Sequence, residues 1–330
     1  MTVLVTGGAG YIGSHMVLEL LDAGQSVVVL DNLSTGFRWA VPQAATLVVG
    51  DAGDQDLVRA LIRKHAVVAI IHFAGSIVVP ESVSDPLGYY HNNTVKSRAL
   101  IESAVASGVQ KFIFSSTAAV YGNPAQNPVS EEADLKPLSP YGWSKLMTEV
   151  MLADTARAHP FRYVALRYFN VAGADPQGRS GQSTPRATHL IKVACETALG
   201  QRSQMDVFGS DYPTHDGTCV RDYIHVTDLA RAHMAALVHL RKGGASDVFN
   251  CGYSKGFSVL EVIEAVKRAS ACDFSVRLAE RRAGDPAAIV AQSVKIREHL
   301  GWTPHHNNLD TIVAQALAWE SQLGRFKQTA

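Results

Sequence analysis

The chain has 330 residues, of which 47% are hydrophobic, so it can bury a large core as one large domain or as two lobes. Thirty basic and thirty acidic residues balance to zero without a long run of one sign, which gives no support for nucleic acid or a membrane surface as a partner. No apolar run approaches the roughly 20 residues that span a bilayer, so we expect no membrane segment.

The chain opens with a pattern of strand, glycine-rich turn and helix. Thr2–Val5 is a short apolar run without the basic region of a signal peptide, Gly7–Gly13 reads GGAGYIG, and Ser14–Ala23 carries an apolar stripe at helical spacing. Such glycines let the backbone turn tightly and let a pyrophosphate approach the amides at a helix N-terminus. The next strand, Ser26–Leu30, ends at Asp31, whose carboxylate can accept hydrogen bonds from ribose hydroxyls and repel a 2′-phosphate. Together these features predict a dinucleotide site that favours NAD over NADP.

Strands and helices keep alternating through the first half of the chain. The predicted strands are Thr46–Val49, Val68–Phe73, Lys111–Ser116 and Arg162–Tyr168, and the predicted helices are Asp54–His65, Thr94–Ser107 and Tyr141–Arg157. This alternation indicates an α/β fold with a Rossmann-type, doubly wound parallel sheet, which binds ligands at the carboxyl ends of its strands. Candidate site residues at such ends are Gly7–Gly13, Asp31, Asp51, Phe73–Gly75 and Thr117.

One run in the middle of the chain combines a tyrosine and a lysine at helical spacing. Ser139–Lys145 reads SPYGWSK, and Pro140 suits the first turn of a helix. Tyr141 and Lys145 are four residues apart, so both side chains point from one helix face. An ammonium beside a phenol lowers the pKa of the phenol, which can then exchange a proton with an alcohol near neutral pH. Such pairs are common, but the strand ends gathered upstream favour a catalytic site.

The pattern loosens after Asn170. Ala172–Pro185 is rich in Gly, Pro, Ser and Asp and is predicted to be a long surface loop or a lid. The other predicted elements are the helices Arg186–Leu199, Val226–Leu240, Ser258–Ala269, Val294–Leu300 and Leu309–Gln322, the strands Met205–Phe208 and Val248–Asn250, and the polar turn Ser210–Gly217. Because no clean linker separates the halves, we expect residues 1–170 to form an NAD-binding domain, with strand contributions near 226–250, and residues 171–330 to form a smaller, interleaved substrate-binding lobe.

Motifs spread over nearly the whole chain match one family. They are Val3–Gly13, Asp31–Leu33, His72–Gly75, Phe112–Gly122, Ser139–Lys145, Leu166–Asn170, Tyr212–Val226 and Arg281–Asp285. With them the chain resembles the extended short-chain dehydrogenase/reductase superfamily and, within it, the family of UDP-glucose 4-epimerases. The resemblance implies reversible 4-epimerisation of UDP-galactose and UDP-glucose, in which tightly bound NAD transiently oxidises sugar C4 and is then restored. It also implies a homodimer packed through Thr94–Ser107 and Tyr141–Arg157.

The resemblance assigns roles to individual residues. Tyr141 would remove the proton of the sugar 4-hydroxyl, Lys145 would hold down the pKa of the phenol and bind the nicotinamide ribose, and Thr117 would place a hydroxyl near the 4-oxygen. The expected cofactor-binding residues are Gly7, Gly10, Tyr11, Ile12, Gly13, Asp31, Asn32, Asp51, Ala52, Phe73, Ala74, Gly75, Asn92, Thr117, Tyr141, Lys145 and Phe169. The expected UDP-sugar-binding residues are Asn170, His189, Leu190, Phe208, Arg221, Tyr223, Val259, Arg282, Asp285 and Ile289. Guanidinium groups suit a diphosphate, and an aromatic ring such as that of Phe208 suits uracil.

Three positions depart from the family pattern. Ile77 stands where well-known members have a lysine, His189 where they have an asparagine, and Ile289 where some members place a tyrosine beside the sugar. A side chain smaller than tyrosine leaves room for an N-acetyl group at C2. We therefore hypothesise some activity on UDP-N-acetylhexosamines, and UDP-pentoses remain a further alternative.

Two other functions are disfavoured relative to epimerisation. A nucleotide-sugar dehydratase or decarboxylase is disfavoured because dehydration needs an acid–base pair beside the hydroxyl residue, whereas Thr117 is followed by Ala118-Ala119. A non-catalytic dinucleotide sensor has no need for Tyr141, Lys145 and Thr117 together. The thirteen histidines show no metal-ligand spacing, so we expect no metal. Four cysteines without CxxC spacing are typical of thiols in a reducing compartment, so we expect a cytoplasmic protein.

Overall fold

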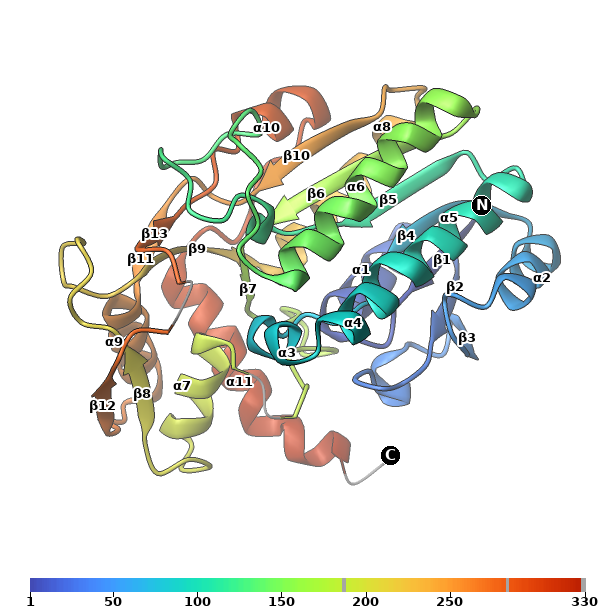
Figure 1. Cartoon of the computed structure of the whole chain (residues 1–330). Helices are drawn as coiled ribbons and strands as arrows, with labels where there is room; N and C mark the ends of the chain where they lie inside the picture. The colour runs from blue at the N-terminus through green and yellow to red at the C-terminus, as the bar shows by residue number, and fades with distance from the viewer. Residues whose placement is uncertain (186–187, 283–284, 328–330) are drawn as a thin grey trace.

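A parallel sheet of seven strands forms the centre of the molecule (Figure 1). The computed structural model describes residues 1–185, 188–282 and 285–327. The strands are β1 (Thr2–Thr6), β2 (Ser26–Asp31), β3 (Thr46–Val49), β4 (Val67–His72), β5 (Lys111–Ser115), β6 (Arg162–Tyr168) and β10 (Asp247–Cys251). Their order is β10-β6-β5-β4-β1-β2-β3, so the chain crosses from β3 at one edge back to β4, which pairs with β1. The predicted doubly wound sheet is confirmed, and its switch point lies between β1 and β4.

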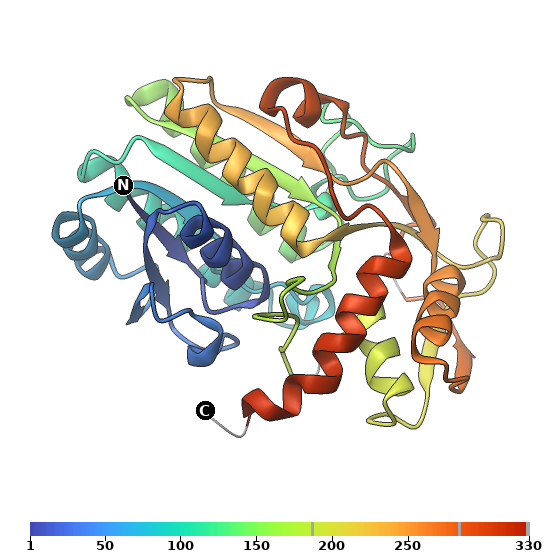
Figure 2. The same ribbon diagram turned by 180° about the vertical axis from the view of Figure 1, so that it is seen from behind.

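Helices cover both faces of this sheet. Those named in this paragraph are α1 (Tyr11–Asp22), α2 (Gln55–His65), α5 (Lys96–Ala106), α6 (Pro140–Ala158) and α8 (Val226–Arg241). One apolar core joins α1 and α8 to the sheet through residues such as Met16, Leu237 and Val5, and Figure 2 shows these helices in front. The opposite face packs against α2, α5 and α6, and Figure 1 shows α5 and α6 in front. Apolar residues on both faces of each strand thus produce the three layers.

A second group of elements lies at the carboxyl ends of the sheet strands, on the left in Figure 1. Its strands are β7 (Asn170–Ala172), β8 (Met205–Phe208), β9 (Val220–His225), β11 (Gly256–Ser258), β12 (Val276–Ala279) and β13 (Ala288–Ile289), and its helices are α7 (Leu190–Ala198), α9 (Val259–Ser270) and α11 (Leu309–Lys327). The helix α10 (Val294–Leu300) instead packs against β10 and α8. The strand β9 organises this lobe because it pairs with β7, β11 and β13, while β12 pairs with β8.

The chain returns from this lobe to the sheet. The strand β10 pairs in parallel with β6, with Phe249 opposite Leu166, which confirms the predicted return of Val248–Asn250. Because β10 and α8 complete the sheet layers, the second half of the chain contributes to both lobes. The domain boundary at residue 170 stays a prediction.

Several predicted elements were wrong in extent or were missed. The predicted helix Arg186–Leu199 begins outside the described residues, and α7 starts only at Leu190 because His189 has extended backbone dihedrals. The predicted helix Thr94–Ser107 is preceded by two short helices, α3 (Val79–Ser84) and α4 (Pro86–Tyr89), and starts with a π-helical turn at Tyr90–Val95. The strands β7, β9, β11 and β13 were missed because short segments with polar residues do not show a strand period.

Candidate active site

The glycine-rich turn between β1 and α1 leaves room for a ligand at the helix N-terminus. Gly7 has φ +72°, a conformation that L side chains rarely adopt. A Cβ on Gly13 would lie 2.1 Å from the carbonyl oxygen of Gly7, so no side chain fits there. Gly10 precedes α1 as its N-cap residue and brings no side chain over the first amides of the helix. The turn therefore fits the pyrophosphate of a dinucleotide.

The carboxylate of Asp31 lies beside this turn. Its Oδ2 atom accepts a hydrogen bond from the amide of Ala9 at 2.9 Å, and its Oδ1 atom accepts one from the amide of Leu33 at 2.8 Å. Asp31 is buried, whereas its neighbour Asn32 is exposed. Each carboxylate oxygen keeps a lone pair for a further donor, so Asp31 can also bind ribose hydroxyls.

Other predicted cofactor residues lie just after β3, in the π-helical turn Tyr90–Val95 and in α1. Asp51 accepts hydrogen bonds from Lys96 Nζ at 2.5 Å and from the amide of Gly53 at 2.8 Å, and Asn92 donates to Ser76 Oγ at 2.9 Å. Ala52 and Ile12 pack against the apolar cores on opposite faces of the sheet.

The end of β4 touches both the glycine turn and the Lys145 ammonium. A Cβ on Gly7 would lie 2.6 Å from the amide nitrogen of Ala74, so the segment after Phe73 runs directly over the turn. A Cβ on Gly75 would lie 3.6 Å from Lys145 Nζ. These contacts bring the predicted cofactor residues of β1 and β4 and the lysine of α6 to one place.

Tyr141 and Lys145 are held by the first turns of α6. Ser139 caps this helix by accepting a hydrogen bond from the amide of Gly142 at 3.2 Å, and Pro140 occupies the first turn as predicted. Both side chains are almost fully buried, with 8% of Tyr141 and 4% of Lys145 exposed. Lys145 Nζ donates to the carbonyl oxygen of Ser115 at 3.0 Å and lies 4.9 Å from the centre of the Phe114 ring.

Burial shifts the pKa values of both Lys145 and Tyr141. It lowers the pKa of the Lys145 ammonium to about 8, against the opposing effect of the Glu149 carboxylate. It raises the pKa of the Tyr141 phenol above its ordinary value, and a hydrogen bond with the Thr117 side chain partly offsets that rise. We expected the lysine to lower the pKa of the phenol. The structure gives the opposite net direction, because a buried phenolate loses its hydration.

Several of the residues predicted to bind the UDP-sugar gather around β9. Arg221 and Tyr223 are two residues apart and therefore lie on one face of the strand. Tyr223 pairs with Asn170 of β7, and Arg221 pairs with Ile289 of β13. Ile289 is buried against a cluster that includes Phe169.

Two further groups of predicted residues lie nearby. Arg282 places its guanidinium carbon 3.7 Å from the centre of the Phe208 ring, and Arg221 Nη2 lies 3.8 Å from Asp285 Oδ1. A cavity between β7 and α7 is lined by Tyr11, Asn170, His189, Leu190 and Tyr223, among others. His189 and Asn170 therefore line the same cavity. Val259, in contrast, packs against the apolar core at the start of α9, and Ile77 is exposed before α3.

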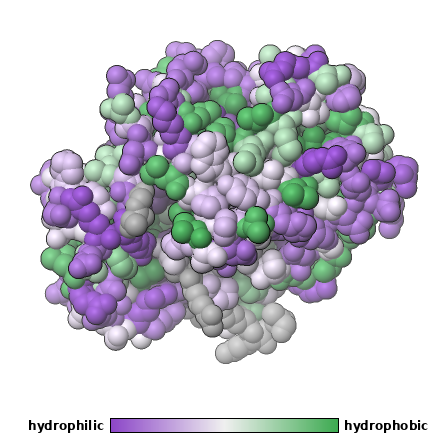
Figure 3. Space-filling view, viewed as in Figure 1, coloured by the Kyte–Doolittle hydropathy of each residue, from purple (hydrophilic) through white to green (hydrophobic). Residues whose placement is uncertain are grey.

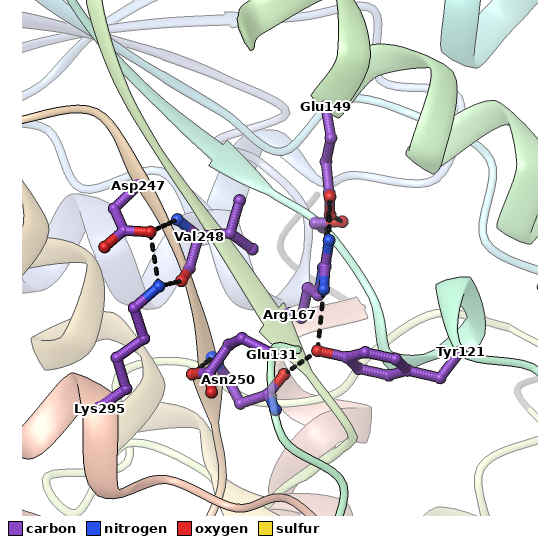
Figure 4. A network of polar contacts seen from close by, with 9 residues as sticks. Tyr121, Glu131, Glu149, Arg167, Asp247, Val248, Asn250 and Lys295 are labelled. Atoms are coloured by element: carbon purple, nitrogen blue, oxygen red, sulfur yellow. Dashed lines mark hydrogen bonds and ion pairs between the residues drawn. The ribbon is translucent and has the colours of Figure 1, made fainter. Parts of the chain in front are cut away.

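Buried charges that were not predicted from the sequence lie beneath the site. Glu149 follows Lys145 by one helical turn, and its carboxylate is held by Arg167 of β6 (Figure 4). Asp222 of β9 accepts hydrogen bonds from the amides of Tyr253, Ser254 and Ala291, and burial raises its pKa to about 6. The four-residue spacing of Tyr141, Lys145 and Glu149 could have revealed Glu149 as a residue of the site, whereas nothing in the local sequence pattern marks Asp222.

Two structural features bear on metal binding and on membrane insertion. Within residues 1–185, 188–282 and 285–327, no group of three or more His, Cys, Asp or Glu side chains could hold a metal ion. Across the same part of the chain, every helix is too short or too polar to cross a membrane.

Known proteins with related sequences and structures share this architecture. Residues 3–252 match the model of the NAD dependent epimerase/dehydratase family. The UDP-glucose 4-epimerase of Azospirillum brasilense is 56% identical over 321 residues, which cover 97% of this chain and 92% of that protein. The crystal structure of UDP-glucose 4-epimerase from Brucella ovis in complex with NAD is 45% identical, with a TM-score of 0.94 over 96% of this chain and 97% of that one. The UDP-Glc/GlcNAc 4-epimerase of Campylobacter jejuni is 49% identical, with a TM-score of 0.85 over 97% of this chain and 99% of that one.

Proposed function

This chain belongs to the NAD dependent epimerase/dehydratase family and, within it, to the UDP-glucose 4-epimerases, and we propose that it interconverts UDP-galactose and UDP-glucose with tightly bound NAD. The observation that carries the proposal is the meeting of Tyr141, Lys145 and Thr117 at the end of β5, beside the glycine turn. A proton NMR time course with UDP-galactose tests it directly.

The cofactor site follows from the geometry of the first two strands. The turn Gly7–Gly13 would hold the pyrophosphate, Asp31 would bind the adenosine ribose, and Lys145 would face the nicotinamide ribose. When bound, NAD would supply the acceptor and then the donor of the hydride at sugar C4, so that the cofactor ends as it began. Since loss of the cofactor during the cycle would strand the sugar as a ketone, a closed and tightly packed site suits the reaction.

Tyr141 acts as the acid–base group in this proposal. Its phenolate takes the proton from the 4-hydroxyl, and the phenol later returns it to the 4-oxygen of the epimer. Burial raises the pKa of Tyr141, and the Thr117 hydrogen bond lowers it. In this proposal the Lys145 ammonium, one helical turn along α6, also stabilises the phenolate. Thr117 also offers its hydroxyl to the 4-oxygen.

Residues of the second lobe would hold the nucleotide. Arg221 and Arg282 carry the positive charge that a diphosphate needs, and the Phe208 ring offers a flat surface for uracil. Asn170 and His189 line the cavity beside Tyr223, where donors can reach the phosphates or the sugar. Ile289 lies beside Arg221 across the β9–β13 pair, which is consistent with a position at the sugar pocket. The residues that the family pattern assigns to the substrate therefore converge on one lobe.

The hypothesis of a wider sugar range rests on Ile289. The Campylobacter jejuni relative is named as a UDP-Glc/GlcNAc 4-epimerase, which shows that an enzyme of similar sequence uses both sugars. A dehydratase stays disfavoured because Ala118 and Ala119 follow Thr117 in a short 3-10 turn and bring no carboxylate. A sensor stays disfavoured because it would not require a buried tyrosine and lysine at a strand end.

We also propose that the enzyme is a homodimer. Apolar side chains are exposed on one face of the molecule, among them Leu87 of α4, Val95 before α5, and Met147 and Val150 of α6. Figure 3, in the view of Figure 1, shows green apolar atoms breaking up the polar surface over these helices. A second copy of α5 and α6 would cover this surface as in a helix bundle.

The proposed setting is galactose metabolism in the cytoplasm. All four cysteines are described residues with free thiols, and three of them are buried. Unpaired cysteines are typical of a reducing compartment.

A further inference from the structure

Tyr141, Lys145 and Glu149 form a row on one face of α6. They are spaced four residues apart, and all three are buried. Each side chain meets one residue of the run that ends β5. The contacts are Lys145 Nζ to the Ser115 carbonyl oxygen at 3.0 Å, Ser116 Oγ to Glu149 Oε1 at 2.5 Å, and the Thr117 side chain to Tyr141. Three consecutive residues of one strand end are thus tied to three successive turns of one helix.

Arg167 fixes the carboxylate of Glu149 from the other side. Its Nε donates to Glu149 Oε1 at 3.0 Å, and its Nη2 donates to Oε2 at 2.6 Å, so the fork holds both oxygens. Only 5% of the side chain of each partner is exposed. Because Arg167 lies in β6, next to β5, Glu149 links α6 to two neighbouring strands.

The contacts continue from Arg167 toward the substrate lobe (Figure 4). Arg167 Nη1 donates to Tyr121 Oη at 2.9 Å, and Tyr121 donates to Asn250 Oδ1 at 2.7 Å. Asn250 Nδ2 donates to the carbonyl oxygen of Val129 at 2.9 Å, and the amide of Val129 donates to the carbonyl oxygen of Val290 at 2.8 Å. Val290 directly follows Ile289, so one continuous chain of hydrogen bonds joins the catalytic helix to the proposed sugar pocket.

We propose that Glu149 and Arg167 are positioning residues for the epimerase reaction: they fix α6 against the end of β5 and so set Tyr141 and Thr117 at the sugar 4-oxygen. This inference rests on the proposed function. In the proposed reaction neither Glu149 nor Arg167 touches the reacting atoms. A small displacement of an acid–base group slows the chemical step while the nucleotide still binds, because the nucleotide is held by other residues.

The charge of Glu149 has a second effect, on Lys145. The titratable groups that interact with this ammonium are Glu149 on α6 and His72 on β4. Glu149 raises the pKa of Lys145, which stands at about 8. Burial lowers the pKa of His72 to about 3, so its ring stays neutral over the working range. Removal of the carboxylate charge therefore lowers the pKa of Lys145 further, and the ammonium is lost at lower pH.

Two variants and one control test the inference. Ser116→Ala removes the contact between Ser116 and Glu149 but leaves the ion pair with Arg167 intact, so the chain is expected to fold. Glu149→Gln keeps the size of the side chain and removes its charge. The control Lys295→Met removes a partly exposed ion pair with Asp247 at the edge of the same sheet, away from α6.

The expected result is a split between turnover and binding. The kcat for UDP-galactose should fall by about fivefold in Ser116→Ala and by about tenfold or more in Glu149→Gln, with KM within about twofold of wild type. In Glu149→Gln the alkaline limb of the kcat profile should also move to lower pH. Lys295→Met should keep the wild-type kcat and pH profile.

The outcomes separate this inference from the proposed function. An inactive wild-type enzyme in the same assay would remove the function itself. Active wild type with unchanged kcat in Ser116→Ala would overturn the positioning role, even if Glu149→Gln failed to fold. An equal loss of kcat in Lys295→Met would also overturn it, because the effect would then be general.

Discussion

Gly13 and Gly7 approach so closely that a Cβ on Gly13 would lie 2.1 Å from the carbonyl oxygen of Gly7. Real side chains essentially never come that near to a backbone oxygen, so the turn must move if position 13 changes. Because the same turn carries the open amides of α1, its shape and the binding of a dinucleotide depend on the same atoms.

Gly13→Ala is therefore expected to lose the cofactor as well as stability. Overpacking of this kind costs about 1–3 kcal/mol, and here it would act at the proposed pyrophosphate site. The measurement is the amount of NAD released per purified chain on denaturation, together with the free energy of unfolding. Gly324→Ala is the matched control, since a Cβ there meets nothing within 4 Å. Full NAD content in Gly13→Ala would contradict the proposed cofactor site.

Tyr141→Phe is expected to abolish proton transfer while leaving the fold and the cofactor in place. General acid–base catalysis contributes about 10²–10⁴-fold, so kcat for UDP-galactose should fall by roughly that factor. Tyr163→Phe is the control, because it removes the hydroxyl of another buried tyrosine, in β6. A Tyr141→Phe enzyme as active as wild type would contradict the acid–base role of Tyr141 and favour a non-catalytic dinucleotide sensor.

Lys145 is expected to reduce stability near neutral pH. Its pKa in the folded chain is about 8, below the value of about 10.4 in an unfolded chain. Between these two pKa values the folded state thus binds fewer protons than the unfolded state. Burial of the charge therefore lowers the free energy of unfolding by its full amount below about pH 8, and this effect fades as the pH rises toward about 10.4.

Lys145→Met should accordingly be more stable than wild type at pH 7, by about 1–3 kcal/mol, with a gain that shrinks near pH 10. It should also lose activity, since the ammonium that stabilises the Tyr141 phenolate is gone. Urea unfolding at both pH values measures the effect, and Lys295→Met, which removes a partly exposed lysine, should show no such gain. A less stable Lys145→Met chain at pH 7 would contradict the assigned burial cost.

The sequence predicted those parts of the molecule that depend on local pattern. The glycine turn, the acid at the end of β2 and the pair at Tyr141 and Lys145 occupy the positions expected of them, and the alternation of elements predicted the sheet. The pKa direction of Tyr141 was wrong because burial is a property of the assembled layers and not of a four-residue spacing.

Long-range pairing explains the remaining differences. The strand β9 carries Asp222 between Arg221 and Tyr223, and this acid looks unsuited to a buried strand until the amides of Tyr253 and Ser254 are placed beside it. Likewise, the role of Glu149 is apparent only in the folded structure, where β6 places Arg167 beside it. No local period could reveal either partner.

Ile289→Tyr tests the width of the sugar pocket. Ile289 is buried, and a larger ring would occupy space that we assign to the C2 substituent. Wild type should convert UDP-N-acetylglucosamine, and the variant should do so at least about tenfold more slowly while its turnover of UDP-galactose changes little. Undetectable turnover of the acetylated sugar by a wild-type enzyme that converts UDP-galactose would rule the hypothesis out.

Val150→Glu tests the proposed dimer. Val150 is exposed on α6, and a charge there would be buried without a partner in a helix-packed interface. Wild type should sediment as a dimer and the variant as a monomer. Leu278→Glu, which alters an exposed apolar residue of β12 in the other lobe, should leave the dimer intact. A monomeric wild type would contradict the proposal.

The most direct measurement is a proton NMR time course of the purified enzyme with UDP-galactose and no added cofactor. We predict conversion toward UDP-glucose, which would establish epimerisation at C4 and show that NAD purifies with the chain. The absence of conversion, even after NAD is added, would contradict the central claim. A 4-keto or decarboxylated product in the same spectra would then indicate a dehydratase or a decarboxylase.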